Sequence, residues 1–112
     1  MRRYGLAVVE GRSMLPTLRS GDRLVVRSGG RPRAGRLAVV RLPQPAGGPP
    51  VLAVKRLAHH DGDGWWVTRD NAREGVDSWS VGAVPDDDVV ATVTIGVWPP
   101  RTWRAARRSR PL

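Results

Sequence analysis

The chain has 112 residues, no cysteine and a formal net charge of +9. This length allows one small domain with a modest core, and the lack of cysteine excludes disulfide bridges and thiolate metal sites. No segment approaches the roughly 18 consecutive apolar residues that cross a bilayer. The apolar run before Glu10 is also too short for a secretory signal, so we expect a cytoplasmic protein without a transmembrane anchor.

Short β-branched runs alternate with turn formers along most of the chain, a pattern that predicts strands. The runs cover residues 5–10, 23–27, 36–42, 50–57, 65–69 and 88–97. Several are apolar on both faces, as in a compact barrel or sandwich. Residues 14–19 can form one helical turn, with Pro16 near its start. We therefore predict a single, mainly β domain over residues 1–98, followed by a basic, flexible tail over 99–112.

Ser13 lies after Gly11, between a predicted strand and a proline-containing turn in "EGRSMLPTLRSGDRLVV". Such a junction can present a hydroxyl group at the rim of a sheet, close to backbone N–H groups that bind an oxyanion. A serine hydroxyl is a poor nucleophile at neutral pH and needs a base within hydrogen-bonding reach. The alternative is a loop serine beside a turn proline.

Lys55 is the only lysine of the chain, because 18 of its 19 basic residues are arginine. An amine can act as a base after losing its proton, whereas a guanidinium stays charged. To titrate near neutral pH, Lys55 would need a pKa roughly three units below the free value, which costs about 4 kcal/mol. We expect burial among Val51, Leu52, Val54 and Leu57 to supply that cost, while Arg56 points to the other face of the strand and stays solvated.

The blocks "SMLPTL", "GDRLVV", "VKR", "DN…DS" and "GAVP" resemble, in order and spacing, the serine–lysine proteases of the signal peptidase I family. The resemblance runs from about Val9 to Val93 and implies a signal-peptidase-like or LexA-like β fold. It implies that Ser13 is the nucleophile, that its N–H contributes to the oxyanion hole, and that Lys55 is the general base. Met14 would line the pocket for the residue before the scissile bond. Segments 7–11 and 51–55, with Gly11 and Val54, would flank a protein substrate bound as an extended strand.

The chain also departs from that family. Gly11 stands where some members carry a second oxyanion donor, Gly75 where a lysine-orienting serine often lies, and Trp79 where an arginine lies. Ser78 is then a candidate partner for Lys55. Asp70, Asn71 and Asp77 are expected to brace the site. The short form without an anchor resembles the maturation proteases of nickel-type superoxide dismutase, which implies removal of an N-terminal leader from that precursor; other pre-proteins remain alternative substrates.

Three other interpretations stay open. The "HHDGD" segment, 59–63, contains potential metal ligands, but adjacent histidines on a strand point to opposite faces, so we expect a polar turn, no metal and no cofactor. His59 or His60 is an alternative base for Ser13. The net charge permits a small basic β domain that binds nucleic acid, although the arginines are scattered and we expect no such partner. A self-cleaving repressor of the LexA type would use the same chemistry, but it needs an upstream cleavage segment and a DNA-binding domain.

Overall fold

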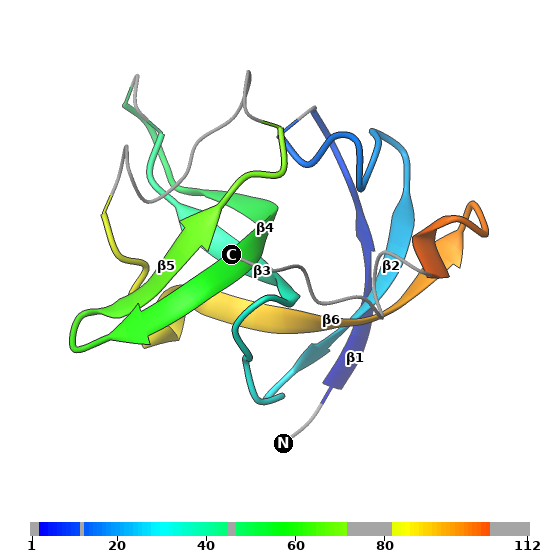
Figure 1. The fold of residues 1–112 in the computed structure, drawn as a ribbon. Coiled ribbons are helices and arrows are strands. Elements are labelled where there is room, and N and C mark those ends of the chain that lie inside the picture. Colours follow the sequence, from blue (N-terminus) through cyan, green and yellow to red (C-terminus); the bar gives the residue numbers. More distant parts are fainter. Residues whose placement is uncertain (1–2, 12, 45–46, 72–81, 104–112) are drawn as a thin grey trace.

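Six antiparallel strands form one sheet in a computed structural model of the chain (Figure 1). The structure describes residues 3–11, 13–44, 47–71 and 82–103. A short 3-10 helix, η1 (Asp86–Asp88), precedes the last strand. The strands are β1 (Arg3–Val8), β2 (Arg23–Ser28), β3 (Leu37–Leu42), β4 (Val51–Asp61), β5 (Gly64–Thr68) and β6 (Val89–Trp98). Each β-branched run of the sequence corresponds to one strand, so the prediction of a mainly β fold is confirmed.

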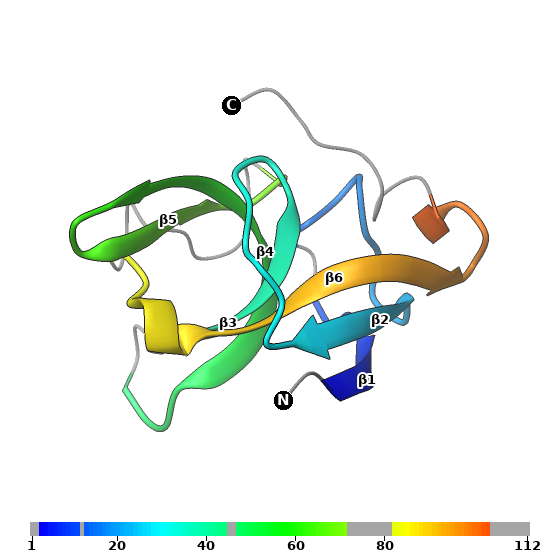
Figure 2. The ribbon, with the colours of Figure 1, turned by 90° about the horizontal axis from the view of Figure 1, so that it is seen from below.

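The strand order is β1-β2-β6-β3-β4-β5, which makes β6 the connection between the two halves of the sheet. Its first residues, from Val89 to Thr92, pair with β3, and the stretch from Thr92 to Trp98 pairs with β2. Figure 2 shows β6 crossing the molecule, with β1 and β2 beside one part of it and the β4–β5 hairpin toward the other end. The sheet is therefore curved, and its two edge strands are β1 and β5.

Strand β3 is buried on both faces and contributes to two separate hydrophobic clusters. Leu37 belongs to the first, while Ala38, Val40 and Leu42 belong to the second. The first cluster is completed by Val9, Met14, Leu18, Leu24 and Val93, and the second by Leu57, Val67 and Val84. This explains why the sequence of β3 is apolar at every position except Arg41, because protein covers both faces along most of the strand.

The β4–β5 hairpin differs from the expectation. Strand β4 continues through His59 and His60 to Asp61, and only Gly62 and Asp63 remain for the turn. Each histidine is opposite a tryptophan of β5, so the cross-strand ring contacts extend the hairpin beyond the apolar run. The prediction that the whole of 59–63 is a turn was therefore wrong.

Residues 99–103, the first part of the expected tail, pack against the sheet. Thr102 is fully buried and its backbone carbonyl lies against Gly96 of β6. Arg101 pairs with the buried carboxylate of Asp22. Residues 104–112 lie outside the described residues. Helical structure in the described ranges is confined to short turns, none with the length and apolarity needed to cross a bilayer.

Gly64 gives a direct test of the hairpin geometry. Its φ is +134°, and a Cβ atom at this position would lie 2.1 Å from the carbonyl oxygen of Val84. We expect Gly64→Ala to lower the free energy of unfolding by about 2–4 kcal/mol, because strain and overlap both oppose the added methyl group. Urea denaturation measures the loss. Gly62→Ala is the matched control, since a Cβ there meets nothing within 4 Å; an equal loss in both variants would contradict the assignment.

Candidate active site

Ser13 starts a turn that follows β1, and its side chain is half-buried. Its backbone carbonyl accepts a hydrogen bond of 2.8 Å from the N–H of Asn71. Within the turn, the N–H of Leu18 donates to the carbonyl of Met14 at 2.9 Å, and both of these side chains are buried in the first hydrophobic cluster. The segment is a hydrogen-bonded turn that contains a cis Leu15–Pro16 peptide bond, so the prediction of a helical turn over 14–19 was wrong. Its core side chains and the bond from Asn71 fix the backbone that carries Ser13.

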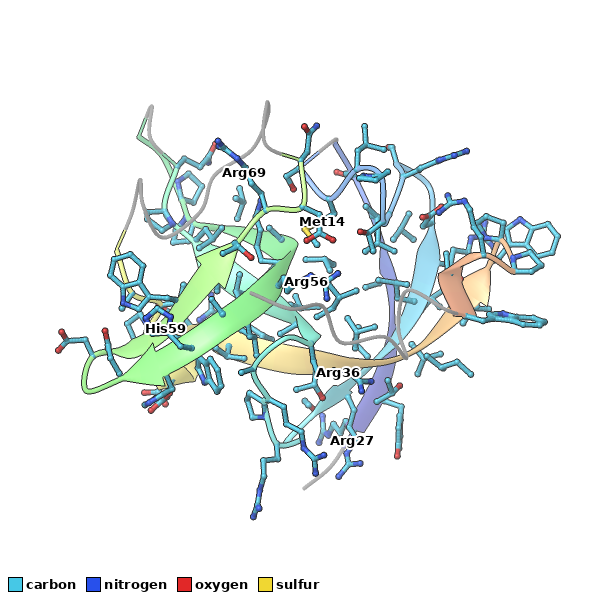
Figure 3. All side chains as sticks on the ribbon, viewed as in Figure 1. Met14, Arg27, Arg36, Arg56, His59 and Arg69 are labelled. Atoms are coloured by element: carbon cyan, nitrogen blue, oxygen red, sulfur yellow. The ribbon has the colours of Figure 1, made fainter. Side chains whose placement is uncertain are left out.

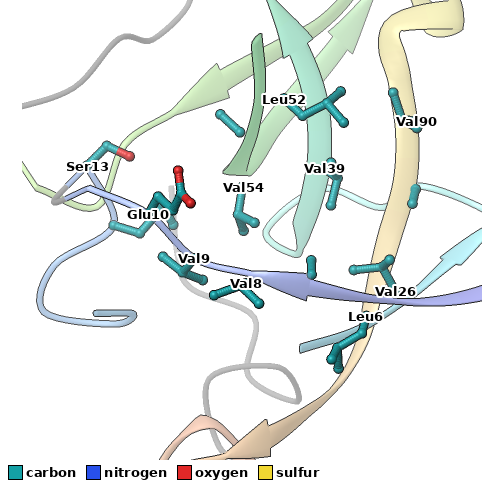
Figure 4. Close-up of a pocket in the computed structure, with 14 residues that line it drawn as sticks. Leu6, Val8, Val9, Glu10, Ser13, Val26, Val39, Leu52, Val54 and Val90 are labelled. Carbon is teal, nitrogen blue, oxygen red and sulfur yellow. The ribbon is translucent and has the colours of Figure 1, made fainter. Parts of the chain in front are cut away.

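A pocket of about 380 Å³ opens beside Ser13 (Figure 4). Ser13 and Glu10 stand at one end of it, and Val26 and Val90 lie toward the other. Its lining is almost entirely aliphatic: Leu6, Ala7, Val8, Val9, Met14, Val26, Val39, Leu52, Ala53, Val54, Val90 and Ala91, with Glu10 and Ser13 as the polar members. The volume lies within the roughly 300–1,000 Å³ range of ligand-binding clefts. An apolar cleft with a hydroxyl group at one end suits a peptide with small or aliphatic side chains.

Two strand edges border this pocket. Val9 uses both its N–H and its C=O toward the β2 side, bonding Asp22 and Gly21. Because these groups alternate in direction along a strand, those of Leu6 and Val8 point away from β2, toward the open edge of β1.

The same alternation applies to β4. Leu57 bonds both Arg36 and Gly35 on the β3 side, so the backbone groups of Leu52 and Val54 point away from β3. Strand β5 pairs with β4 only from Arg56 onward. In the described part of the chain, the first half of β4 therefore has an open edge, as β1 has.

Lys55 lies in the buried interior, with only 3% of its surface exposed. Its backbone is opposite Ala38 of β3, which is fully buried. Val51 and Leu52 do not shield it as expected, because they are 44% and 61% exposed. The surrounding fold supplies the burial instead. Burial disfavours the charged form of an amine, and this is the environment that a lysine base requires.

Arg56 is buried, with 2% of its surface exposed, so the prediction that it stays solvated was wrong. Its Nε and Nη2 donate to the two carboxylate oxygens of Asp70 at 2.9 and 2.8 Å. Its Nη1 donates to the carbonyl of Gly35 at 2.7 Å. Figure 3 shows Arg56 in the middle of the molecule. The second face of β4 is covered by protein, and a charge there is tolerated because a carboxylate neutralises it.

Asp70 connects this ion pair to the turn that bears Ser13. Its carboxylate also accepts a hydrogen bond from the hydroxyl of Thr17, which lies in that turn. The next residue, Asn71, bonds the backbone of Ser13. Arg56, Asp70 and Thr17 therefore fasten together β4, the segment after β5 and the Ser13 turn. We call these three residues the Arg56 clamp.

The expected site residues fall into three groups. Ser13, Met14 and Val54 line the pocket, and Asp70 and Asn71 contact the turn that carries Ser13. Gly11 has a φ of +81° in the bend before Ser13, an angle that favours glycine, and it does not line the pocket. The remaining predicted positions, Gly75, Asp77, Ser78 and Trp79, lie outside the described residues. Sequence reasoning did not assign Glu10, Thr17 or Arg56 to the site; the last two belong to the quoted blocks "SMLPTL" and "VKR".

The histidines of β4 lie in a separate aromatic group. His59 stacks on Trp66 with ring centroids 5.9 Å apart, and His60 contacts Trp65 edge-on at 5.2 Å. His60 also bonds Asp86 at 2.8 Å. No cluster of three or more metal-ligating side chains occurs among the described residues.

Asp61 ends this strand as a turn-stabilising residue. The backbone N–H of Asp63 and the indole N–H of Trp66 donate to its carboxylate, and these bonds hold the pKa of Asp61 below its usual value. Its two carboxylate oxygens therefore stabilise the turn of the β4–β5 hairpin.

Comparison with known protein families gives a match to Peptidase S24-like over residues 2–92. Searches of curated proteins and of solved structures give no match. The matched range contains Ser13, Lys55 and every residue that lines the pocket. The match covers most of the 112 residues, and it agrees with a mainly β domain that has an apolar cleft beside a serine. The chain belongs to the Peptidase S24-like family.

Proposed function

We propose that this peptidase is a serine endopeptidase in which Ser13 is the nucleophile and Lys55 is the general base. The observation that carries the proposal is the apolar pocket with Ser13 at one end, between two strand edges that no other described strand covers. The burial of the only lysine, on the strand that forms one of those edges, supports the choice of base. Family membership supports the peptidase activity itself.

The substrate would bind as an extended strand between β1 and β4. The outward-pointing backbone groups of Leu6 and Val8 on one side, and of Leu52 and Val54 on the other, would bond its main chain. Side chains that point into the pocket would meet aliphatic residues, including Met14 next to the nucleophile. This arrangement favours small or aliphatic residues at those positions of the substrate.

In the chemical step, neutral Lys55 takes the proton of the Ser13 hydroxyl while its oxygen attacks the scissile carbonyl. The backbone N–H of Ser13 contributes to binding the oxyanion, and residue 11, a glycine, has no side-chain hydroxyl to act as a second donor. The protonated lysine then gives its proton to the leaving amine. Water activated by Lys55 releases the acyl group and restores Ser13. The chemistry needs no metal or cofactor.

Asp70 and Asn71 would position the nucleophile through their contacts with the Ser13 turn. Asp77 would brace the neighbouring segment, and Ser78 would bond Lys55 and orient it. These roles follow from the resemblance of "DN…DS" to the signal peptidase I family.

The signal peptidase I type and the substrate belong to this proposal. The substrate would be a protein with an N-terminal leader, and the precursor of nickel-type superoxide dismutase is the first candidate. Purified protein mixed with that precursor should release the leader, and mass spectrometry should find one new N-terminus. Ser13→Ala is the matched control. Cleavage that persists in this variant would contradict the proposal, and cleavage of a different pre-protein would replace the substrate.

A second candidate is cleavage of the protein's own chain, as in self-cleaving repressors of the LexA type, and membership of the S24-like family favours it. Incubation of the pure protein at alkaline pH separates the two. Fragments that form at a rate independent of protein concentration, and that disappear in Ser13→Ala, would indicate self-cleavage. Salt-dependent binding of DNA or RNA that survives Ser13→Ala would instead favour a nucleic-acid-binding protein.

A further inference from the structure

Among the described residues that line the pocket, Glu10 supplies the only charged side chain. It is exposed, and it stands at the same end of the pocket as Ser13 (Figure 4). The other lining residues are aliphatic apart from Ser13. A bound peptide would therefore meet one negative charge, close to the bond that is cut.

Other acidic side chains of the described residues mostly have partners. Asp22 pairs with Arg101, Asp70 with Arg56 and Asp88 with Arg41. Asp86 bonds His60, and Asp61 bonds Trp66. The described acidic residues without a partner within those ranges are Glu10, Asp63 and Asp87, and only Glu10 lines the pocket. In a protein of net charge +9, a carboxylate left unpaired at this position is available to a cation from outside.

The direction of Glu10 identifies which part of a peptide it meets. The preceding residue, Val9, is 5% exposed and belongs to the first hydrophobic cluster, whereas Glu10 is exposed. Successive side chains of an extended peptide also point to opposite sides. Those that enter the aliphatic pocket therefore alternate with those that point outward. Glu10 therefore faces an outward-pointing side chain near the scissile bond.

We propose that Glu10 is a specificity-determining residue that selects substrates with a lysine or arginine at an outward-pointing position within about two residues of the scissile bond. This inference rests on the function proposed above. The carboxylate and the cation would form an ion pair at the rim of the pocket, partly screened by solvent. Such pairs are worth up to about fivefold in binding, so we expect about a two- to fivefold preference in kcat/KM for lysine over glutamine. Without Glu10, the positive charge of the protein would favour neutral or acidic peptides.

The test uses a library of decapeptides in which each position is varied in turn, with cleavage products read by mass spectrometry. The expected result is a preference for lysine and arginine at one position near the cut, absent in Glu10→Gln and turned toward glutamate in Glu10→Lys. Ratios of kcat/KM are then measured within each variant, for a pair of peptides that differ only by lysine or glutamine. Asp63→Asn is the matched control, because it removes an unpaired carboxylate that does not line the pocket, and its ratio should equal that of the wild type.

The outcomes separate the inference from the function on which it rests. Ser13-dependent cleavage without a basic preference, or with a preference that Glu10→Gln retains, would overturn the role of Glu10 and leave the peptidase proposal standing. A preference lost equally in Asp63→Asn would show a general charge effect and would also overturn it. If no peptide is cut in a Ser13-dependent manner, both proposals fail together.

Discussion

Replacing Lys55 by arginine or Ser13 by alanine is expected to lower kcat/KM for a cleaved peptide by at least about 10³-fold. Ser13→Ala removes the nucleophile, and Lys55→Arg replaces the neutral amine by a permanently charged guanidinium that cannot accept a proton. General-base catalysis alone contributes about 10²–10⁴-fold, and a nucleophile and its base act as one unit. Initial rates on one peptide, at equal concentrations of each variant, measure the loss.

Because Lys55 is 3% exposed, the bulkier arginine can also disturb the fold. Lys55→Met is therefore the second variant, since it preserves length and apolar volume without the amine. Both proteins should be inactive, and Lys55→Met should keep the circular dichroism spectrum of the wild type. Wild-type activity should rise with pH as the amine loses its proton. Substantial activity in either variant, or a flat pH profile, would contradict a lysine base.

Breaking the Arg56 clamp is expected to cost the largest share of stability. Asp70→Ala leaves the Arg56 guanidinium buried without its carboxylate, and the loss of one partner of a buried ion pair costs about 3–5 kcal/mol. It also removes the acceptor of the Thr17 hydroxyl. Small domains have only about 5–15 kcal/mol of stability in total, so the midpoint of urea denaturation should fall steeply.

The chain offers a matched control for this change. Arg41 and Asp88 form an ion pair of 3.0 Å, but their side chains are 46% and 34% exposed. Asp88→Ala should therefore change the free energy of unfolding by no more than about 1 kcal/mol. Thr17→Val removes one hydrogen bond of the clamp and should cost about 1 kcal/mol. Equal losses in Asp70→Ala and Asp88→Ala would show that the buried pair is not a structural clamp.

Strand positions could be predicted from the sequence because turn formers separate compact β-branched runs. The extent of β4 could not, since His59 and His60 enter the strand through contacts with tryptophans of the following strand. A local pattern of polar residues contains no information about such cross-strand partners. The alternation of β4 likewise failed for Arg56, because it assumes that one face of a strand meets water.

The candidate site also combines features that the sequence predicts with features that depend on tertiary contacts. Ser13 and Lys55 could be selected from residue chemistry and motif spacing, and Met14 and Val54 from the family resemblance. The pocket itself depends on how the sheet curves, which brings β1 and β4 to opposite sides of one cleft although they lie more than 40 residues apart in the chain. Glu10 gave no signal, since a single acidic residue beside a glycine is ordinary in a surface loop.

The shared position of β3 in both hydrophobic clusters has a consequence for how the molecule opens. Neither cluster can lose its packing without exposing part of β3. The unfolding of the part of the domain around one cluster is therefore thermodynamically coupled to that of the part around the other. Amide hydrogens of Ala38 to Val40 should exchange only through global unfolding. A destabilising substitution in the β4–β5 hairpin should also lower the melting temperature of the part of the domain that contains Ser13. The protein would then denature in a single concerted transition.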